Sequence, residues 1–190
     1  TDAHFTHWAM LEVYDVIKYA FQKRYWDDLK RSMLHVTQIP LIIGEDTWII
    51  GGHGVSSGSN WTNDVETYMD FIIAQYLTLK HYVKEPCMAI GDDISHRRDS
   101  YDPDLADKIA SECQAMGFDV NAEKVTNNKD SVKFLQRLSI RGFTSGKTWS
   151  VKGVEYPLLR GIYPTVRALN SSLHPEKFHS PKLWSKDMFA

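Results

Sequence analysis

The residues of this chain best suited to chemistry are two adjacent aspartates that follow a glycine. Asp92 and Asp93 come directly after Gly91, and the motif lies between two short apolar stretches that predict strands. Carboxylates at such a turn are hard oxygen ligands of the kind that Mg²⁺ and Mn²⁺ prefer. Two of these ions about 4 Å apart can activate an attacking oxygen and neutralise a leaving one in phosphoryl transfer. Taken alone, the motif fits an ordinary hairpin turn equally, because Gly and Asp are common turn residues.

Two other motifs could supply groups that act on a nucleotide. Ser57 and Gly58 belong to a glycine-rich loop that leads into a predicted helix at Thr62, which would bring hydroxyls and a helix N-terminus near a phosphate. Lys124 follows a predicted helix and turn, where it could protonate departing pyrophosphate. Each motif has an ordinary alternative, because glycine loops often precede capped helices and most lysines are solvated surface residues.

A further motif combines an aromatic residue with a cation. Phe134 and Arg137 lie on a predicted strand, where they could grip a phosphate of a primer strand. Half-buried packing of the strand explains the same pair of residues. The alternatives therefore stay open for each motif taken by itself.

Hydrophobic periodicity predicts the elements that must position these residues. Helices and strands alternate irregularly, which is typical of an α+β fold, and the strand before Gly91 is expected to be buried. Asp102 and Pro103 are expected to cap and open the fourth helix, and Gly117 to close it. The expected helices cover about 4–22, 26–36, 62–79, 102–116 and 164–173, and the expected strands cover about 41–43, 48–50, 87–90, 118–120, 132–140 and 149–156.

Composition narrows the class of protein without choosing a function. With 190 residues, 43% of them hydrophobic and 24% charged, the chain predicts one globular region with a real core. A net charge of −2 gives no support to nucleic-acid binding, although cations gather in the middle of the chain. Two cysteines cannot form a disulfide framework, which favours a reducing intracellular location, and no apolar run is long enough for a membrane span.

The order of the motifs resembles that of viral RNA-dependent RNA polymerases. The palm of that family carries a Ser-Gly-x-x-x-Thr loop and helix, a Gly-Asp-Asp hairpin, a helix before a lysine-bearing strand, and a Phe-Leu-x-Arg hairpin, and this chain contains all four. The segment 163–177 also resembles the thumb entry of picobirnavirus and partitivirus polymerases. The resemblance implies an α+β palm, with an antiparallel sheet backed by helices, over residues 1–144. The start of a thumb would follow over 145–190, in a right-hand architecture that lacks fingers.

Carried over residue by residue, the resemblance implies an enzyme that copies an RNA template by nucleotidyl transfer with two Mg²⁺ or Mn²⁺ ions. Asp92 would be the principal metal ligand, Asp93 the second, and Lys124 the general acid. Nucleotide or ribose binding would fall to Asp2, Ser57, Gly58, Thr62 and Asn63, and template or primer binding to Phe134 and Arg137.

The implied partners are the RNA template, the growing strand and nucleoside triphosphates, and the resemblance adds a viral capsid protein as a candidate partner. No membrane is implied. The implied location is the host-cell cytoplasm, with the interior of the virion as the alternative.

Two departures from the family pattern qualify this expectation. The first aspartate of the family's opening palm motif would fall before Thr1, so the chain is expected to be part of a larger protein and inactive alone. Many plus-strand virus polymerases have an asparagine four residues after the motif threonine, where this chain has Glu66. An acidic residue at this position favours a resemblance to viruses with double-stranded RNA.

Two rival functions remain at this stage. A reverse transcriptase uses a similar hairpin, but that family usually has an aromatic residue two positions before the paired aspartates, where this chain has Ile90. A non-catalytic, RNA-binding remnant of a polymerase is the rival from another class. The intact pair of carboxylates disfavours it, because clustered like charges are expensive to keep without a use.

Overall fold

The computed structural model describes residues 5–55, 59–118, 120, 122 and 125–173. The chain divides into two compact units, Thr1–Asn127 and Asn128–Ala190. The first unit contains the helices α1 (His7–Ile17), α2 (Trp26–His35), α3 (Thr62–Leu79) and α4 (Leu105–Ala115), the short 3₁₀ helices η2 (Lys18–Ala20) and η3 (Lys23–Tyr25), and the strands β1 (Leu41–Gly44), β2 (Thr47–Ile49), β3 (Lys84–Ile90) and β4 (Asp93–Arg97). The second contains β5 (Ser131–Phe134), β6 (Arg137–Ile140), β7 (Thr144–Val151), β8 (Val154–Leu159) and α5 (Thr165–Leu173).

The main core of the first unit lies between α1, α2 and α3. Apolar residues recur at helical spacing on each of these helices, so each helix presents one apolar stripe to the others. Met10, Met33 and Val65 take these positions on α1, α2 and α3, and each has an exposed fraction of 0%. Burial of these stripes is the main source of stability for the unit. The core also contains Phe5, Ala9, Val13, Tyr14, Ile17, Leu29, Val36, Val55 and Met69.

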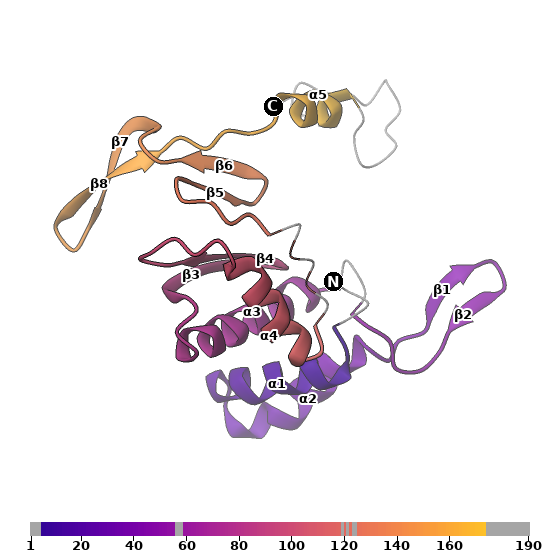
Figure 1. Ribbon diagram of the computed structural model, residues 1–190. Helices are drawn as coiled ribbons and strands as arrows, with labels where there is room; N and C mark the ends of the chain where they lie inside the picture. Colours follow the sequence, from indigo (N-terminus) through magenta and orange to yellow (C-terminus); the bar gives the residue numbers. More distant parts are fainter. Residues whose placement is uncertain (1–4, 56–58, 119, 121, 123–124, 174–190) are drawn as a thin grey trace. The chain divides into compact units, whose positions relative to one another are not determined.

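The β3–β4 hairpin packs against α3. The two strands are antiparallel, and the pairing of Ile90 with Asp93 closes the hairpin on a two-residue turn made of Gly91 and Asp92. Figure 1 shows the hairpin lying along α3. A second, smaller core joins the end of α3 to α4 through Leu77, Val83, Ile109 and Cys113. The carboxylates of the turn are therefore carried by an element that one face of α3 supports.

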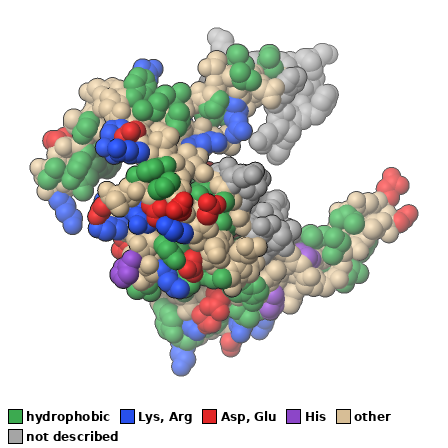
Figure 2. Space-filling model, viewed as in Figure 1, with side chains coloured by type: hydrophobic (Ala, Val, Ile, Leu, Met, Phe, Trp, Pro, Cys, Tyr) green, Lys and Arg blue, Asp and Glu red, His purple; other side chains and the backbone are tan. Residues whose placement is uncertain are grey.

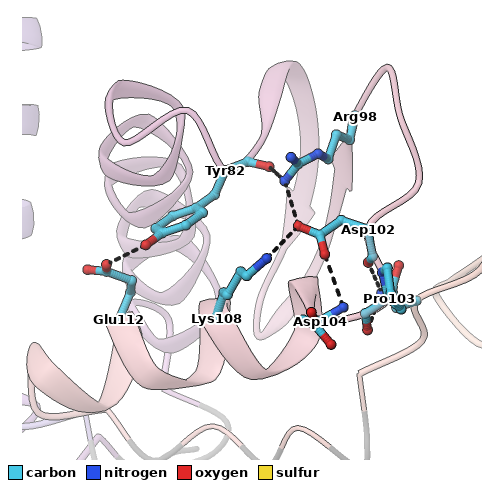
Figure 3. Close-up of polar contacts among 8 residues, drawn as sticks. Tyr82, Arg98, Asp102, Pro103, Asp104, Lys108 and Glu112 are labelled. Atoms are coloured by element: carbon cyan, nitrogen blue, oxygen red, sulfur yellow. Dashed lines mark hydrogen bonds and ion pairs between the residues drawn. The ribbon is translucent and has the colours of Figure 1, made fainter.

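Polar contacts fasten α4 to the same hairpin (Figure 3). Arg98, directly after β4, donates to the backbone oxygen of Tyr82 at 2.9 Å and pairs with Asp102 at 3.3 Å. Asp102 also accepts from Lys108 Nζ at 2.8 Å. Near the other end of α4, Glu112 accepts from the hydroxyl of Tyr82 at 3.1 Å. These bonds tie both halves of α4 to residues that flank β3 and β4.

The ends of α4 test the predicted capping residues. The helix begins at Leu105, with Asp104 at the N-cap, so the prediction that Asp102 caps it is wrong. Asp102 lies before the first turn of the helix. Its carboxylate accepts a hydrogen bond from the backbone N–H of Asp104 and pairs with the side chains of Arg98 and Lys108. The predicted end is confirmed, because Gly117 has φ of +91°, a conformation that favours glycine.

The second unit is built from two hairpins and one helix. The β5–β6 hairpin turns at Leu135 and Gln136, and the β7–β8 hairpin turns at Lys152 and Gly153. Single strands over 132–140 and 149–156 were expected, and both expectations are wrong. Side chains alternate with a period of two residues along a strand, and a two-residue turn does not interrupt this period. The alternation of residues therefore did not reveal the turns.

Three other expectations are corrected or limited by the structure. Strand β3 is not buried: α3 packs against one face of the hairpin, and Met88 on the other face is 52% exposed. Phe118 and Val120 do not lie in a strand, and Asp119 is outside the described residues.

The α+β class is confirmed, whereas the boundary of palm and thumb at residue 144 stays a prediction. Among the described helices, none is both long and apolar enough to cross a membrane.

Replacement of Met33 by Ala is expected to lower the free energy of unfolding by about 2–5 kcal/mol, because it leaves a cavity in the main core. The control is Leu79→Ala at the end of α3, where the side chain is 70% exposed. That change should shift stability by less than about 0.5 kcal/mol. Urea unfolding followed by circular dichroism measures both, and equal effects would contradict the described core.

Candidate metal and nucleotide site

One polar stripe of α3 faces the turn between β3 and β4. Asn63, Glu66, Thr67 and Asp70 recur at the spacing that places side chains on one face of a helix. The hydroxyl of Thr67 accepts a hydrogen bond of 2.7 Å from the backbone N–H of Gly91. This bond and the packing of α3 against β3 bring the stripe beside the paired aspartates.

Gly91 is required at the turn for two reasons. Its φ of +57° lies in the left-handed region, which side chains other than glycine rarely adopt. It is also buried against α3, since a Cβ added there would lie 3.1 Å from Oδ1 of Asn63 and 3.9 Å from Oε2 of Glu66. The glycine of the motif therefore lets the hairpin approach the helix closely.

The electrostatics of the site are dominated by carboxylates. The pKa of Asp70 is raised to about 7, chiefly by burial and then by the charges of Asp92, Glu66 and Asp93, in that order. Oδ2 of Asp70 is buried and has no hydrogen-bond partner among the described residues. Glu66 is itself only 7% exposed. Figure 2 shows acidic side chains gathered on the surface where the hairpin lies.

This concentration of negative charge is the main chemical property of the site. Four carboxylates contribute to one local field, and like charges that cannot be separated favour either a bound proton or a bound cation. The raised pKa of Asp70, caused first by burial and then by this field, is the proton-binding response of the site. Oxygen ligands are the ones that Mg²⁺ and Mn²⁺ prefer, so the donor chemistry fits the metals expected from the sequence.

The geometry of the described residues supplies only part of a metal cage. In the part of the chain that the structure describes, no group of three or more His, Cys, Asp or Glu side chains converges on one point that could hold an ion. Asp92 and Asp93 are both exposed at the turn. They therefore form one side of a site that other ligands would have to complete.

The structure places some of the predicted nucleotide-binding residues. Thr62 is buried at the first turn of α3, and Asn63 follows it with an exposed side chain beside Gly91. Asp2, Ser57, Gly58 and Lys124 lie outside the described residues, so their predicted roles stay predictions.

The described residues next to the predicted loop are well anchored. Before the loop, the backbone N–H of His53 donates to Thr37 O at 3.0 Å, and Nε2 of His53 lies 2.6 Å from Ile39 O. After the loop, the backbone N–H of Thr62 donates to Ser59 O at 3.3 Å. The loop is thus bounded on both sides by fixed backbone.

The described residues around Lys124 are anchored in a similar way. The ring of Phe118 contacts that of Trp8, with 5.2 Å between the ring centroids. Nδ2 of Asn127 donates to the backbone oxygens of Asp102 and Pro103 at 2.8 Å and 3.3 Å.

The residues predicted to contact a primer lie in the second unit. Phe134 pairs with Arg137 across the β5–β6 hairpin, on either side of its turn. The stem of Arg137 packs against the backbone at Gly161, where an added Cβ would lie 3.3 Å from Cδ. The backbones of Leu138 and Ile162 exchange hydrogen bonds of 2.9 Å and 2.7 Å. The hairpin and the segment before α5 are therefore held together.

A cationic hollow lies next to this hairpin, within the second unit. It has a volume of about 390 Å³. Two cations and two amides line it, and no carboxylate does, so the hollow favours an anion. Gln136 is held in place by the hydroxyl of Tyr163, which lies 3.4 Å from Oε1. Figure 2 shows lysine and arginine side chains near α5 on the visible face. The lining residues are Lys133, Gln136, Pro164, Val166, Arg167 and Asn170.

Two functional candidates, Thr67 and Asp70, are absent from the sequence-based prediction. The signal was present, because Asn63, Glu66, Thr67 and Asp70 form a polar stripe along a helix that is otherwise rich in apolar residues. The helical spacing of Val65, Tyr68, Met69, Ile72, Tyr76 and Leu79 predicts one apolar stripe on α3, and this is only partly right, since Tyr68 is 43% exposed. A polar stripe of this kind indicates a face that meets something other than the core.

The fold resembles part of the fold of viral RNA-dependent RNA polymerases. The chain is similar to a solved structure of the RNA-dependent RNA polymerase of a human picobirnavirus, with a TM-score of 0.76 and 23% identity. The match covers 99% of this chain and 34% of that polymerase. The insertion-loop deletion mutant of a human picobirnavirus polymerase gives a TM-score of 0.79 and 23% identity over 99% of this chain and 35% of its own.

Sequence comparison agrees with the structural comparison. A potential RNA-dependent RNA polymerase of human picobirnavirus (strain Human/Thailand/Hy005102/-) is 26% identical over 152 residues, which are 79% of this chain and 26% of that protein. No protein-family model matches the chain. The resemblance predicted from the motifs is confirmed, and the chain spans roughly a quarter to a third of the length of these relatives.

Replacement of Asp70 by Asn is expected to stabilise the protein at high pH. The folded state raises the pKa of Asp70 from 3.8 to about 7, so its contribution to stability is greatest at low pH and is lost as the pH rises through 7. We expect D70N to be more stable than the parent by about 1–3 kcal/mol near pH 8, with the difference vanishing near pH 4.

Thermal unfolding in the presence of a chelator measures this effect without interference from divalent cations. The matched control is Asp64→Asn, which removes an exposed carboxylate from the first turn of the same helix. The control should keep the pH dependence of the parent. A D70N variant that is no more stable than the parent at high pH would contradict the described burial of this carboxylate.

Proposed function

We propose that the natural full-length protein containing this sequence is an RNA-directed RNA polymerase that replicates or transcribes a viral RNA genome. The observation that carries the proposal is the packing of the polar stripe of α3 against the Gly91–Asp93 turn, within a fold shared with picobirnavirus polymerases. The relatives support a virus with double-stranded RNA of the picobirnavirus kind. The rival functions, a reverse transcriptase and a non-catalytic RNA-binding remnant, have no described contact that favours them.

In this proposal Asp92 and Asp93 hold divalent cations, two Mg²⁺ or Mn²⁺ ions in the complete site. Such ions, when bound, lower the charge on the attacking and leaving oxygens of a phosphoryl transfer. Described residues of the turn and of α3 would favour the binding of these ions. Gly91 allows the turn to lie against α3, and α3 adds the buried charge of Glu66 and Asp70 behind the turn. The site therefore attracts cations before any nucleotide arrives.

The other chemical roles belong to residues around this centre. Thr62 and Asn63 lie at the start of α3, and Asn63 lies beside Gly91, which suits contact with the ribose of an incoming nucleotide. Asp2, Ser57 and Gly58 would complete nucleotide binding, and Lys124 would protonate the pyrophosphate. The reaction then depends mainly on positioning and on neutralising charge.

RNA contact is proposed for the second unit. The cationic hollow offers Lys133 and Arg167 together with amide donors of Gln136 and Asn170, and these groups match the oxygens of a phosphodiester backbone. Its open form suits a polymer that passes across it. Phe134 and Arg137, on the adjoining hairpin, are the residues proposed to contact the primer or product strand.

The cellular setting follows from the proposed activity. Template RNA, product RNA and nucleoside triphosphates would be the partners, and a viral capsid protein is a further candidate. The proposed location is the host-cell cytoplasm, with the virion interior as the alternative.

Asp92→Ala is expected to abolish RNA-templated nucleotide incorporation by the full-length protein in the presence of Mg²⁺ or Mn²⁺, because it removes the principal metal ligand. A loss of at least about a thousandfold is expected for an essential ligand. Asp46→Ala is the matched control, since Asp46 is an exposed aspartate in the turn of the β1–β2 hairpin. Full activity in D92A would refute the assignment of the metal site, and no activity in the parent would favour the RNA-binding rival.

The double variant Lys133→Gln/Arg167→Gln is expected to weaken RNA binding in a salt-dependent way. Loss of two phosphate contacts should reduce the slope of log Kd against log salt concentration by about one to two. The control, Lys147→Gln/Lys152→Gln, removes the same charge from the exposed β7–β8 hairpin. Filter binding with a short primer–template duplex provides the measurement. Equal slopes for both double variants would mean that the hollow has no special part in binding.

A further inference from the structure

The hydroxyl of Thr67 joins α3 to the turn that carries the paired aspartates. It donates a hydrogen bond of 2.6 Å to the backbone oxygen of Asn63, one turn back on α3. It also accepts a hydrogen bond of 2.7 Å from the backbone N–H of Gly91. One side-chain oxygen thus connects the backbone of the helix with the backbone of the hairpin.

The position of Gly91 explains why this bond matters. Gly91 is the first residue of the two-residue turn, directly before Asp92. A buried backbone N–H needs a partner, because an unsatisfied donor is costly to bury. Gly91 is buried, and the hydroxyl of Thr67 satisfies its donor. Movement of the turn away from α3 would break this bond.

We propose that Thr67 is a positioning residue that fixes the carboxylates of Asp92 and Asp93 relative to the nucleotide-binding end of α3. The proposal rests on the polymerase function proposed above. Asn63, at that end, is one of the two residues that the hydroxyl links, and its own Oδ1 lies beside Gly91. Thr67 therefore couples the residues that would contact the ribose with the turn that would hold the metal ions.

The chain offers a closely matched control for this residue. Thr78 lies on the same helix, is half-buried like Thr67, and donates to the backbone oxygen of Ala74 at 2.8 Å. Its hydroxyl thus makes the same bond to the preceding turn, but among the described residues it makes no hydrogen bond to the β3–β4 hairpin. Replacement of either threonine by valine keeps the shape of the side chain and removes only the hydroxyl.

The test measures single-nucleotide incorporation by the full-length protein at varied nucleotide and Mg²⁺ concentrations. In Thr67→Val we expect kcat to fall by about 10- to 100-fold, the range that a misplacement of about 1 Å can produce. KM for the nucleotide should change by less than about threefold, and half-maximal activity should need more Mg²⁺, because the turn carries the metal ligands. Thr67→Ser should restore most of kcat, and Thr78→Val should resemble the parent.

Two outcomes would overturn the proposal. One is a Thr67→Val enzyme whose kcat and Mg²⁺ dependence stay within about twofold of the parent. The other is an equal loss in Thr78→Val, which would assign the effect to the helix as a whole.

Amide hydrogen exchange at Gly91 separates this proposal from the polymerase function, because it needs no activity. Faster exchange in Thr67→Val, but not in Thr78→Val, supports the link even if the parent protein incorporates no nucleotide. Unchanged exchange in Thr67→Val would overturn the link whatever the activity of the parent.

Discussion

Mutual repulsion of carboxylates is the constraint on which the first unit depends. Packing of α3 against the β3–β4 hairpin buries Asp70 and brings Glu66 and Asp70 into the field of Asp92 and Asp93. Burial first, and these charges second, raise the pKa of Asp70 to about 7. A protein does not gain stability from such an arrangement, because buried like charges disfavour the folded state. The same arrangement is what a site for divalent cations needs. With the metal site proposed above, function and stability are opposed at this point of the fold.

The rest of the unit offsets this unfavourable charge. Helix α3 contributes Val65 and Met69 to the core shared with α1 and α2, and Leu77 to the smaller core shared with α4. Because α3 belongs to both cores, its orientation is fixed independently of the carboxylates that it carries. Polar contacts of Asp102 and Glu112 then fix α4 beside the hairpin. The site is thus placed on elements that apolar burial and side-chain hydrogen bonds already hold rigid.

Much of this could be predicted from the sequence, and the failures have physical causes. The amphipathic helices and the Gly91–Asp93 turn were predictable because their signals are local. The hairpins at residues 135–136 and 152–153 were not, because Leu135, Gln136 and Lys152 adopt positive φ although they are not the Gly, Asn or Asp that usually signal such a turn. The role of Asp70 depends on which element α3 packs against, and that partner is set by tertiary contacts between residues far apart in the sequence. Periodicity identifies a polar face but does not say what meets it.

The central claim is that Asp92 and Asp93 hold catalytic metal ions against α3. Anomalous diffraction from Mn²⁺-soaked crystals of the full-length protein, with RNA and a nucleotide bound, tests it most directly. We expect a peak about 2.0–2.3 Å from a carboxylate oxygen of Asp92. Peaks confined to other carboxylates, with none beside Asp92, would contradict it.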